Sequence, residues 1–307
     1  MRPALQAAVL TLALAASGGC NRHVVKHPPS PQEQARHAYF KGMEDLVAGN
    51  YLPAIQIFNQ VARSPRYVRY AALARLRIGD AFFLQDRFEE AIEAYRVFVA
   101  QYGSDANVPY ARFRIAAAYH ARMPGSWFAT PPASEMDQTM TTQAQRELEG
   151  FLRTFPTSRY APEARRMLID ARKMLLEHEL YVARYYEKRQ KWRATAWRLD
   201  GALRTYPELA GTPDIVWRMA RAYQRADEDA DAARAYAMYL ERFPKGPKRR
   251  GAKQALDELR RDLENPPPAA PESGADTSAP HAAPAPAEDD DGDSPPPERP
   301  DADIDDP

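Results

Sequence analysis

The chain has a single cysteine, Cys20, among its 307 residues. One cysteine excludes an intrachain disulfide and any zinc site built on a pair of cysteines. The sequence also lacks a glycine-rich phosphate loop and a Gly-x-Ser-x-Gly nucleophile motif. The histidines stand singly, except His23 and His27, which have no third ligand nearby. We therefore expect no catalytic activity, no metal and no dissociable cofactor.

The formal net charge of zero conceals an uneven distribution. Residues 265–307 contain twelve Asp or Glu, one Arg and twelve of the 28 prolines, with almost no large apolar side chain. Such a stretch cannot bury enough surface to offset the entropy of ordering, so we predict a disordered tail. The other residues carry 41 basic and 30 acidic side chains, a net of +11 that is spread along the expected helices. Because no nucleic-acid-binding motif accompanies this charge, we expect no nucleic-acid partner.

Residues 1–19 have the features of an export signal. Arg2 precedes an apolar run over residues 4–16, and these thirteen residues are fewer than the roughly 20 that span a bilayer as a helix. The small residues before Cys20 resemble a bacterial lipoprotein signal, in which the cysteine is acylated and becomes the mature N-terminus, although Ser17 departs from that pattern. A secreted protein with a free Cys20 thiol is the alternative.

A lipid on Cys20 would anchor the chain to a membrane through several acyl chains. Asn21 follows the cysteine, whereas Asp at that position is the inner-membrane retention signal, so retention in the inner membrane is not indicated. Residues 20–31 are the expected tether. The ten residues 21–30 are polar, contain two prolines and reach at most about 35 Å, so the folded part would lie close to the membrane surface.

Apolar residues recur at helical spacing from 32 to 264, and no stretch alternates as a strand. Gly42, Gly79 and Ala116 follow one another at intervals of 37 residues, and Ala183 and Ala220 are also 37 apart. Downstream of each comes a small residue, a large apolar residue four positions later and an apolar residue three after that. These sets are Ala54, Phe58 and Val61; Ala91, Tyr95 and Phe98; Ala144, Leu148 and Phe151; Thr195, Leu199 and Ala202; and Ala232, Tyr236 and Tyr239.

This two-helix pattern is that of the tetratricopeptide (TPR) repeat, in which small residues lie where the two helices of a hairpin approach closely. It predicts an all-α fold, a right-handed solenoid of five TPR-like hairpins over residues 32–264. Two insertions interrupt the register. The first insertion, residues 122–141, contains three prolines and one glycine, which favour a loop. The second insertion lengthens the first helix of repeat four, which starts at Pro162, to about 25 residues. Residues 247–264 are predicted to form a capping helix.

The first helices of a TPR stack line its concave face, and here their offset positions are mostly apolar or aromatic: Tyr39, Met43, Leu46, Leu76, Phe83, Tyr110, Phe113 and His120. A groove of this kind suits an extended or helical peptide, with burial in the core as the alternative for each residue. Trp127 and Phe128 are adjacent aromatic residues in the first insertion. They fit either a folded-back loop core or an exposed protein contact.

The stretch from Phe151 to about Phe243 resembles the BamD family, lipoproteins of the outer-membrane β-barrel assembly machinery. The resemblance is carried by Phe155, Pro156, Ser158 and Tyr160; by Tyr181, Val182, Ala183, Tyr185, Tyr186 and Trp192; by Arg198, Leu199, Asp200, Gly201, Leu203, Arg204, Tyr206 and Pro207; and by Ala222, Tyr223 and Gln224. The acidic tail lies outside the family pattern.

The resemblance implies a non-catalytic subunit on the periplasmic face of the outer membrane. It would dock on the POTRA domains of the central β-barrel assembly protein, alongside other assembly lipoproteins, and receive unfolded outer-membrane proteins. Arg198 and Asp200 are the implied partner-binding residues, and the groove at Tyr39, Phe83 and Phe113 would take the client. A TPR lipoprotein of secretin or pilus assembly, or of envelope coordination, is the alternative, and a peptidoglycan-active enzyme would need a catalytic domain that residues 265–307 cannot supply.

Overall fold

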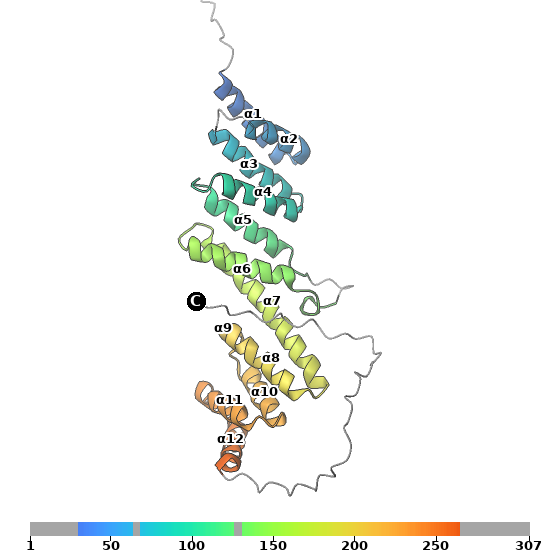
Figure 1. The fold of residues 1–307 in the computed structure, drawn as a ribbon, viewed down its shortest axis with the longest axis vertical. Helices are drawn as coiled ribbons and strands as arrows, with labels where there is room; N and C mark the ends of the chain where they lie inside the picture. The colour runs from blue at the N-terminus through green and yellow to red at the C-terminus, as the bar shows by residue number, and fades with distance from the viewer. Residues whose placement is uncertain (1–29, 64–67, 126–130, 265–307) are drawn as a thin grey trace, which may run out of the picture. The chain divides into compact units, whose positions relative to one another are not determined.

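The computed structural model describes residues 30–63, 68–125 and 131–264. Within these ranges all regular structure is helical, with twelve α-helices, one short 3₁₀ helix and no strand (Figure 1). The expected all-α class is therefore confirmed. Cys20, Trp127 and Phe128 lie outside the described residues, as do the export signal and the acidic tail.

The helices are short, apart from one, and follow the expected order. Their bounds are α1 Pro31–Val47, α2 Tyr51–Ala62, α3 Val68–Phe83, α4 Phe88–Gln101, α5 Val108–Ala121, η1 Ala133–Glu135, α6 Thr139–Thr154, α7 Ala161–Lys188, α8 Trp192–Thr205, α9 Pro207–Ala210, α10 Pro213–Arg225, α11 Asp229–Arg242 and α12 Arg249–Glu264. The chain divides into two compact units between Ala81 and Phe82, near the end of α3.

The first unit contains α1, α2 and α3 as far as Ala81. Helix α1 begins with a capping box, in which Ser30 Oγ accepts from Glu33 N and the Glu33 carboxylate accepts from Ser30 N at 2.7 Å. Gly42 faces α2 so closely that an added Cβ would stand 2.7 Å from the ring of Phe58. Glycine here allows the close approach of two helices that the repeat pattern predicts.

The second unit contains the helices from α4 onward, and each helix packs mainly on its neighbours in the chain. The predicted second-helix positions all lie in the core, none more than 4% exposed, in both units. The small first-helix residues Ala116, Ala183 and Ala220 have no exposed surface. The repeat pattern therefore identifies the buried face of each hairpin correctly.

Helix α7 has 28 residues and is about 42 Å long, in agreement with the predicted long helix of repeat four. Its first half joins a core cluster with α5 and α6 through Ala164, and its second half joins the cluster of α8 and α10 through Leu175 and Ala183. Between the two halves of α7, the Arg172 guanidinium forms ion pairs with Glu149 on α6, at 3.0 Å, and with Glu208 on α9, at 2.6 Å. One helix therefore connects two stretches of core.

The predicted loop at the first insertion is present in its described part, where only η1 is regular. Gln138 holds its end, donating to the carbonyl oxygens of Ala133 and Met136 at 2.7 and 2.8 Å and accepting from Thr141 Oγ1. The buried Gln138 side chain directly precedes α6. This helix begins at Thr139, two residues before the predicted end of the loop.

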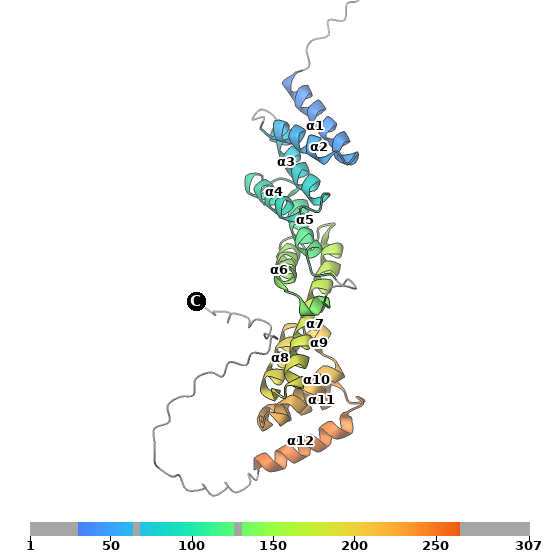
Figure 2. The same ribbon diagram turned by 90° about the vertical axis from the view of Figure 1, so that its right-hand side faces the viewer.

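The C-terminal elements agree with the prediction. Helix α12 packs on α11 (Figure 2), and it buries Ala252, Leu256 and Leu259 on one face, as expected of a capping helix. Pro207 follows the end of α8 at Thr205 and begins the four-residue helix α9. Its fixed φ and missing N–H suit the first position of a helix as well as the position after one.

Candidate partner-binding surface

A hollow on α8 brings together several of the residues that the family resemblance singles out. It has a cavity volume of about 180 Å³ and is lined by Glu179, Trp197, Arg198, Gly201, Thr205 and Tyr206. Four of these residues come from α8 itself, because positions 197, 198, 201 and 205 return to one side of a helix at 3.6 residues per turn. The opposite side of α8 carries Thr195, Leu199 and Ala202 into the core.

Arg198 is held in place by a residue of the preceding helix. Its Nη1 donates to Glu179 Oε2 on α7 at 3.5 Å, and both side chains are largely covered, with 24% and 11% of their surfaces exposed. A guanidinium has five N–H donors in a fixed plane, so one contact with Glu179 leaves donors for a second acceptor. Arg198 is thus positioned by the fold while part of it faces the hollow.

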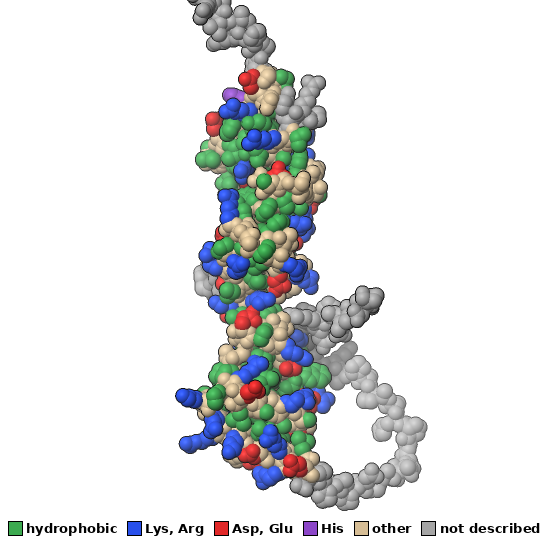
Figure 3. Space-filling model, turned by 90° about the vertical axis from the view of Figure 1, so that its left-hand side faces the viewer, with side chains coloured by type: hydrophobic (Ala, Val, Ile, Leu, Met, Phe, Trp, Pro, Cys, Tyr) green, Lys and Arg blue, Asp and Glu red, His purple; other side chains and the backbone are tan. Residues whose placement is uncertain are grey.

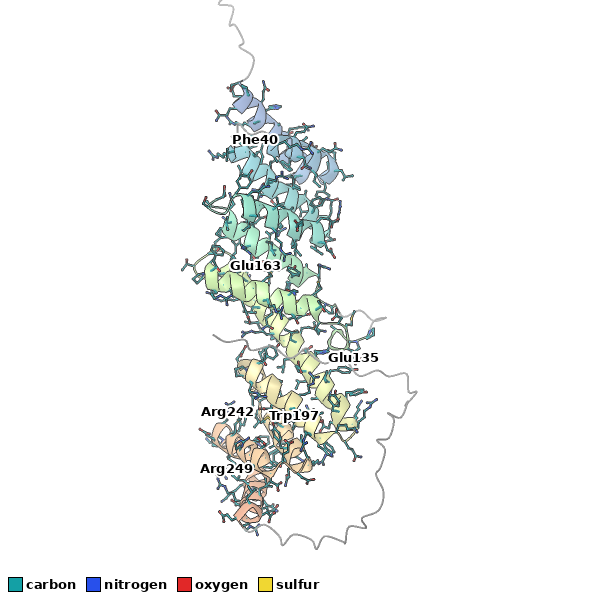
Figure 4. All side chains as sticks on the ribbon, in the orientation of Figure 1. Phe40, Glu135, Glu163, Trp197, Arg242 and Arg249 are labelled. Carbon is teal, nitrogen blue, oxygen red and sulfur yellow. The ribbon has the colours of Figure 1, made fainter. Side chains whose placement is uncertain are left out.

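Trp197 is the largest exposed apolar side chain on α8, with 59% of its surface accessible (Figure 4). Trp197 was not among the predicted partner-binding residues. The signal was present, because Trp197 stands two positions after the buried Thr195 and therefore on the other side of the helix. An exposed indole next to a positioned guanidinium combines the two residue types that most often dominate protein interfaces.

Asp200 is engaged within the chain. It accepts from Arg204 Nη2 at 3.0 Å on the same helix. Burial, and then the charges of Asp200 and Asp231, raise the pKa of Tyr223 on α10 to about 12. The predicted part of Asp200 in partner binding stays a prediction.

Four of the predicted groove residues are buried, which was the alternative stated for each of them. Leu76 has no exposed surface, and Tyr39, Leu46 and Phe113 are at most 6% exposed, so these four do not line an open groove. Tyr39 accepts a hydrogen bond from Arg77 Nε at 3.3 Å within the first unit. Phe113 stacks on Tyr160 at 5.0 Å in the second. Helical spacing identifies apolar residues but does not say which of two apolar sides faces a neighbouring helix.

The other predicted groove residues keep some surface. Met43 is half-buried on α1, and Phe83 is half-buried beneath the Arg114 guanidinium, 3.6 Å from its ring centre. Two residues near Met43 that were not predicted are far more open, Phe40 at 51% (Figure 4) and Val47 at 82% exposed. Phe40, Met43 and Val47 follow the spacing i, i+3 and i+7, so they form one apolar stripe on α1.

A second hollow lies among α4, α5 and α6 and was not predicted. Its cavity volume is about 450 Å³, and its lining is Val99, Gly103, Val108, Arg112, Glu147, Gly150, Phe151, Thr154 and Phe155. Most of this lining is apolar or small, and it includes one cation and one carboxylate.

The described residues contain no group of three His, Cys, Asp or Glu side chains placed to hold a metal ion. The absence of catalysis and of a cofactor stays a prediction. In the same ranges, no helix combines the length and apolar character needed to cross a bilayer.

The chain matches known proteins over most of its helical part. The model of the YfiO family, described as an outer membrane lipoprotein, matches residues 31–239. An outer membrane protein assembly factor BamD of Xylella fastidiosa is 26% identical over 209 residues, 67% of this chain and 70% of that protein. The protein of the same name from Caulobacter vibrioides is 24% identical over 245 residues, 79% of this chain and 77% of the relative.

Among solved structures, the TPR2AB domain of yeast Sti1 in complex with a pHSP90 peptide is similar at 14% identity, over 76% of this chain and 92% of that one. Its TM-score of 0.38 is too low to add to the assignment. The family match extends over more than half of the chain and includes both α1 and the α8 surface. The chain therefore belongs to the YfiO family of outer membrane lipoproteins.

Proposed function

We propose that the chain is a non-catalytic scaffold of outer-membrane protein assembly that docks on the POTRA region of the central β-barrel assembly protein through Trp197 and Arg198. The relatives are outer membrane protein assembly factors, which supports this setting. The observation that carries the docking surface is the exposed Trp197 beside an Arg198 that Glu179 already holds.

The energetics favour docking at this hollow. Covering the exposed indole would remove a large apolar area from water, and aromatic side chains bury 150–250 Å² each, so roughly 2–4 kcal/mol is available from Trp197 alone. Arg198 loses little side-chain entropy on binding because its ion pair with Glu179 already restricts it. A partner carboxylate could accept from the guanidinium N–H groups that this pair does not use.

Gly201 supports the same conclusion. It lies in the interior of α8, where glycine costs up to about 1 kcal/mol relative to alanine. Apart from its chain neighbours and the backbone of its own helix, no atom of the described residues lies within 4 Å of the Cβ that an alanine would add, so packing among them does not require glycine. A bare backbone in the lining of the hollow instead gives an incoming side chain room to approach Trp197 and Arg198.

For the client side we propose the apolar stripe Phe40, Met43 and Val47 on α1, in place of the buried groove residues. Because of their spacing, the three side chains lie on one side of α1 and can contact an apolar peptide together. Arg36 lies over the Phe40 ring at 5.9 Å and adds a cation next to the stripe. Unfolded outer-membrane proteins are the expected occupants because the relatives act in their assembly.

The anchor is proposed to be a lipid on Cys20, at the periplasmic face of the outer membrane. The family description as an outer membrane lipoprotein supports it. In cells that lack the assembly partners, a Cys20→Ala chain should leave the membrane fraction while the unaltered chain floats with outer membranes. A Cys20→Ala chain that still floats would show that another feature is the anchor.

The function as a whole is tested by affinity capture from solubilised envelopes with the full chain as bait. Recovery of the β-barrel assembly protein is expected, and its loss in a Trp197→Ala chain would place the contact at α8. Recovery of a secretin or pilus component in its place would support the alternative of a TPR lipoprotein for that machinery.

A further inference from the structure

Six cations and no acidic residue occur between positions 242 and 256, at the junction of α11 and α12. They are Arg242, Lys245, Lys248, Arg249, Arg250 and Lys253, and all six are exposed. We call this set the basic corner. Figure 4 labels Arg242 at the end of α11 and Arg249 at the start of α12, and Figure 3 shows Lys and Arg side chains gathered over these C-terminal helices.

The basic corner is not neutralised by the part of the chain that the structure describes. The ion pairs of the C-terminal helices join other residues, such as Arg204 with Asp200 and Arg218 with Glu187. None of the six cationic side chains forms an ion pair or a hydrogen bond within the described ranges, although Glu241 and Asp257 flank the set in sequence. A cluster of like charges attracts anions through its summed potential.

The turn that carries the basic corner is fixed by packing. Lys248 N donates to Tyr239 Oη at 3.0 Å, and a Cβ at Gly246 would lie only 2.6 Å from the same hydroxyl. On α12, a Cβ at Gly251 would meet the Trp217 ring at 3.1 Å. The cations therefore project from a rigid support.

The charges of α12 oppose its dipole at this end. Its first turn contains no acidic residue and begins with Arg249 and Arg250, directly after Lys248. A helix N-terminus carries about half a positive charge, so cations there are unfavourable and an anion is favoured. The corner and the helix end thus attract the same kind of ligand.

A strongly acidic segment exists on the same chain. Glu288, Asp289, Asp290, Asp291 and Asp293 place five carboxylates in six positions, within residues 265–307, which hold one arginine. We propose that this acidic run binds the basic corner of its own chain.

The length of the connection fits this proposal. Residues 249 and 264 lie at the two ends of α12, about 22 Å apart at 1.5 Å per residue. The 23 residues between 264 and 288 include seven prolines, and a proline-rich segment extends by up to about 3.1 Å per residue, so the 24 steps reach at most about 74 Å. This reach is more than three times the length of α12, so the acidic run can return to the basic corner of its own chain.

Zero-length cross-linking with a carbodiimide tests the proposal on the purified full chain, because this reagent joins lysine amines to adjacent carboxylates. Mass spectrometry should find Lys245, Lys248 or Lys253 linked to residues 288–293. In a mixture of chains with light and heavy nitrogen, these links should lie within one chain. They should disappear at about 1 M salt, where the screening length falls to roughly 3 Å.

The decisive variant reverses the three arginines and keeps the lysines that the chemistry needs: Arg242→Glu, Arg249→Glu and Arg250→Glu together. The links should fall about tenfold, since three weak attractions become repulsions. The matched control, Arg146→Glu, Arg153→Glu and Arg166→Glu, changes three exposed arginines of α6 and α7 by the same charge and should keep the links. Thermal melting followed by circular dichroism checks that both variants fold.

Three results would overturn the proposal. The first is equal linking in the corner variant and the control variant. The second is linking between chains of different isotope content, which would make the occupant a second copy. The third is the absence of tail links together with corner-dependent binding to vesicles that contain an anionic phospholipid, which would make the occupant a membrane surface.

Discussion

Arg198 Nη1 lies 3.5 Å from Glu179 Oε2, and this ion pair joins α8 to the long helix α7 beside the proposed docking hollow. Replacing Arg198 by Glu would set two carboxylates against each other in a largely covered place. We expect Arg198→Glu to lower the free energy of unfolding by about 1–3 kcal/mol, and Arg198→Gln to lower it by clearly less, because the amide can still donate to Glu179. Urea unfolding of the two variants measures the difference, and equal stabilities would show that the pair has no such role.

A substitution at Gly201 should affect the stability of the fold and the binding of the partner in opposite directions. Gly201→Ala should raise the free energy of unfolding by roughly 0.5–1 kcal/mol, because alanine favours the helix interior and the space is open. The added methyl group should at the same time weaken binding to the POTRA region. Gly150→Ala, in α6 and away from the α8 hollow, serves as the control and should leave binding unchanged. Stabilisation with unchanged binding in Gly201→Ala would remove Gly201 from the interface.

Gly42 should respond in the opposite sense. Gly42→Ala would place a Cβ 2.7 Å from the buried ring of Phe58, so α1 and α2 must separate. Overpacking of this kind costs about 1–3 kcal/mol. Hydrogen exchange should accelerate in α1 and α2, and should be unchanged in α10 and α11. Unchanged protection of α1 would mean that the two helices pack less tightly than described.

His120 makes stability depend on pH. Burial lowers the pKa of its imidazole from the ordinary 6.5, and Asp170 at 3.9 Å only partly opposes that shift. Since the folded state binds the proton less readily than the unfolded state, this contribution is fully present above pH 6.5 and is lost as the pH falls through the lower folded-state pKa. Between pH 7.5 and 5.5 the urea midpoint should fall less in His120→Gln than in the unaltered chain. Equal falls would exclude His120 as the cause.

The helical repeat could be predicted because the two helices of every hairpin pack against each other in the same way. Two helices that approach closely admit only a small residue at the contact, so Ala116, Ala183 and Ala220 identify the contact from sequence alone. The long helix α7 followed from the lack of proline or glycine between Pro162 and Gly201. These predictions depend on the local sequence and not on contacts between residues that are distant in the chain.

The binding surfaces could be predicted only in part. Leu76 and Phe40 are both apolar residues of first helices, yet Leu76 is fully buried and Phe40 is half open, because neighbouring helices decide which side is covered. Trp197 could have been found from its place opposite Thr195 on α8. The link between Arg198 and Glu179 joins residues 19 positions apart on different helices and could not be read from either local pattern.

The most direct test of the proposed function is the dissociation constant of the full chain with the isolated POTRA region of the β-barrel assembly protein. The double variant Trp197→Ala with Arg198→Gln should bind about 30-fold or more weakly, as expected when two central interface residues are truncated. The control, Ile169→Ala with Arg166→Gln, removes another exposed apolar residue and another exposed arginine, both on α7, and should bind within about twofold of the unaltered chain. Equal affinity of the double variant and the unaltered chain, or an equal loss in the control, would contradict docking through α8.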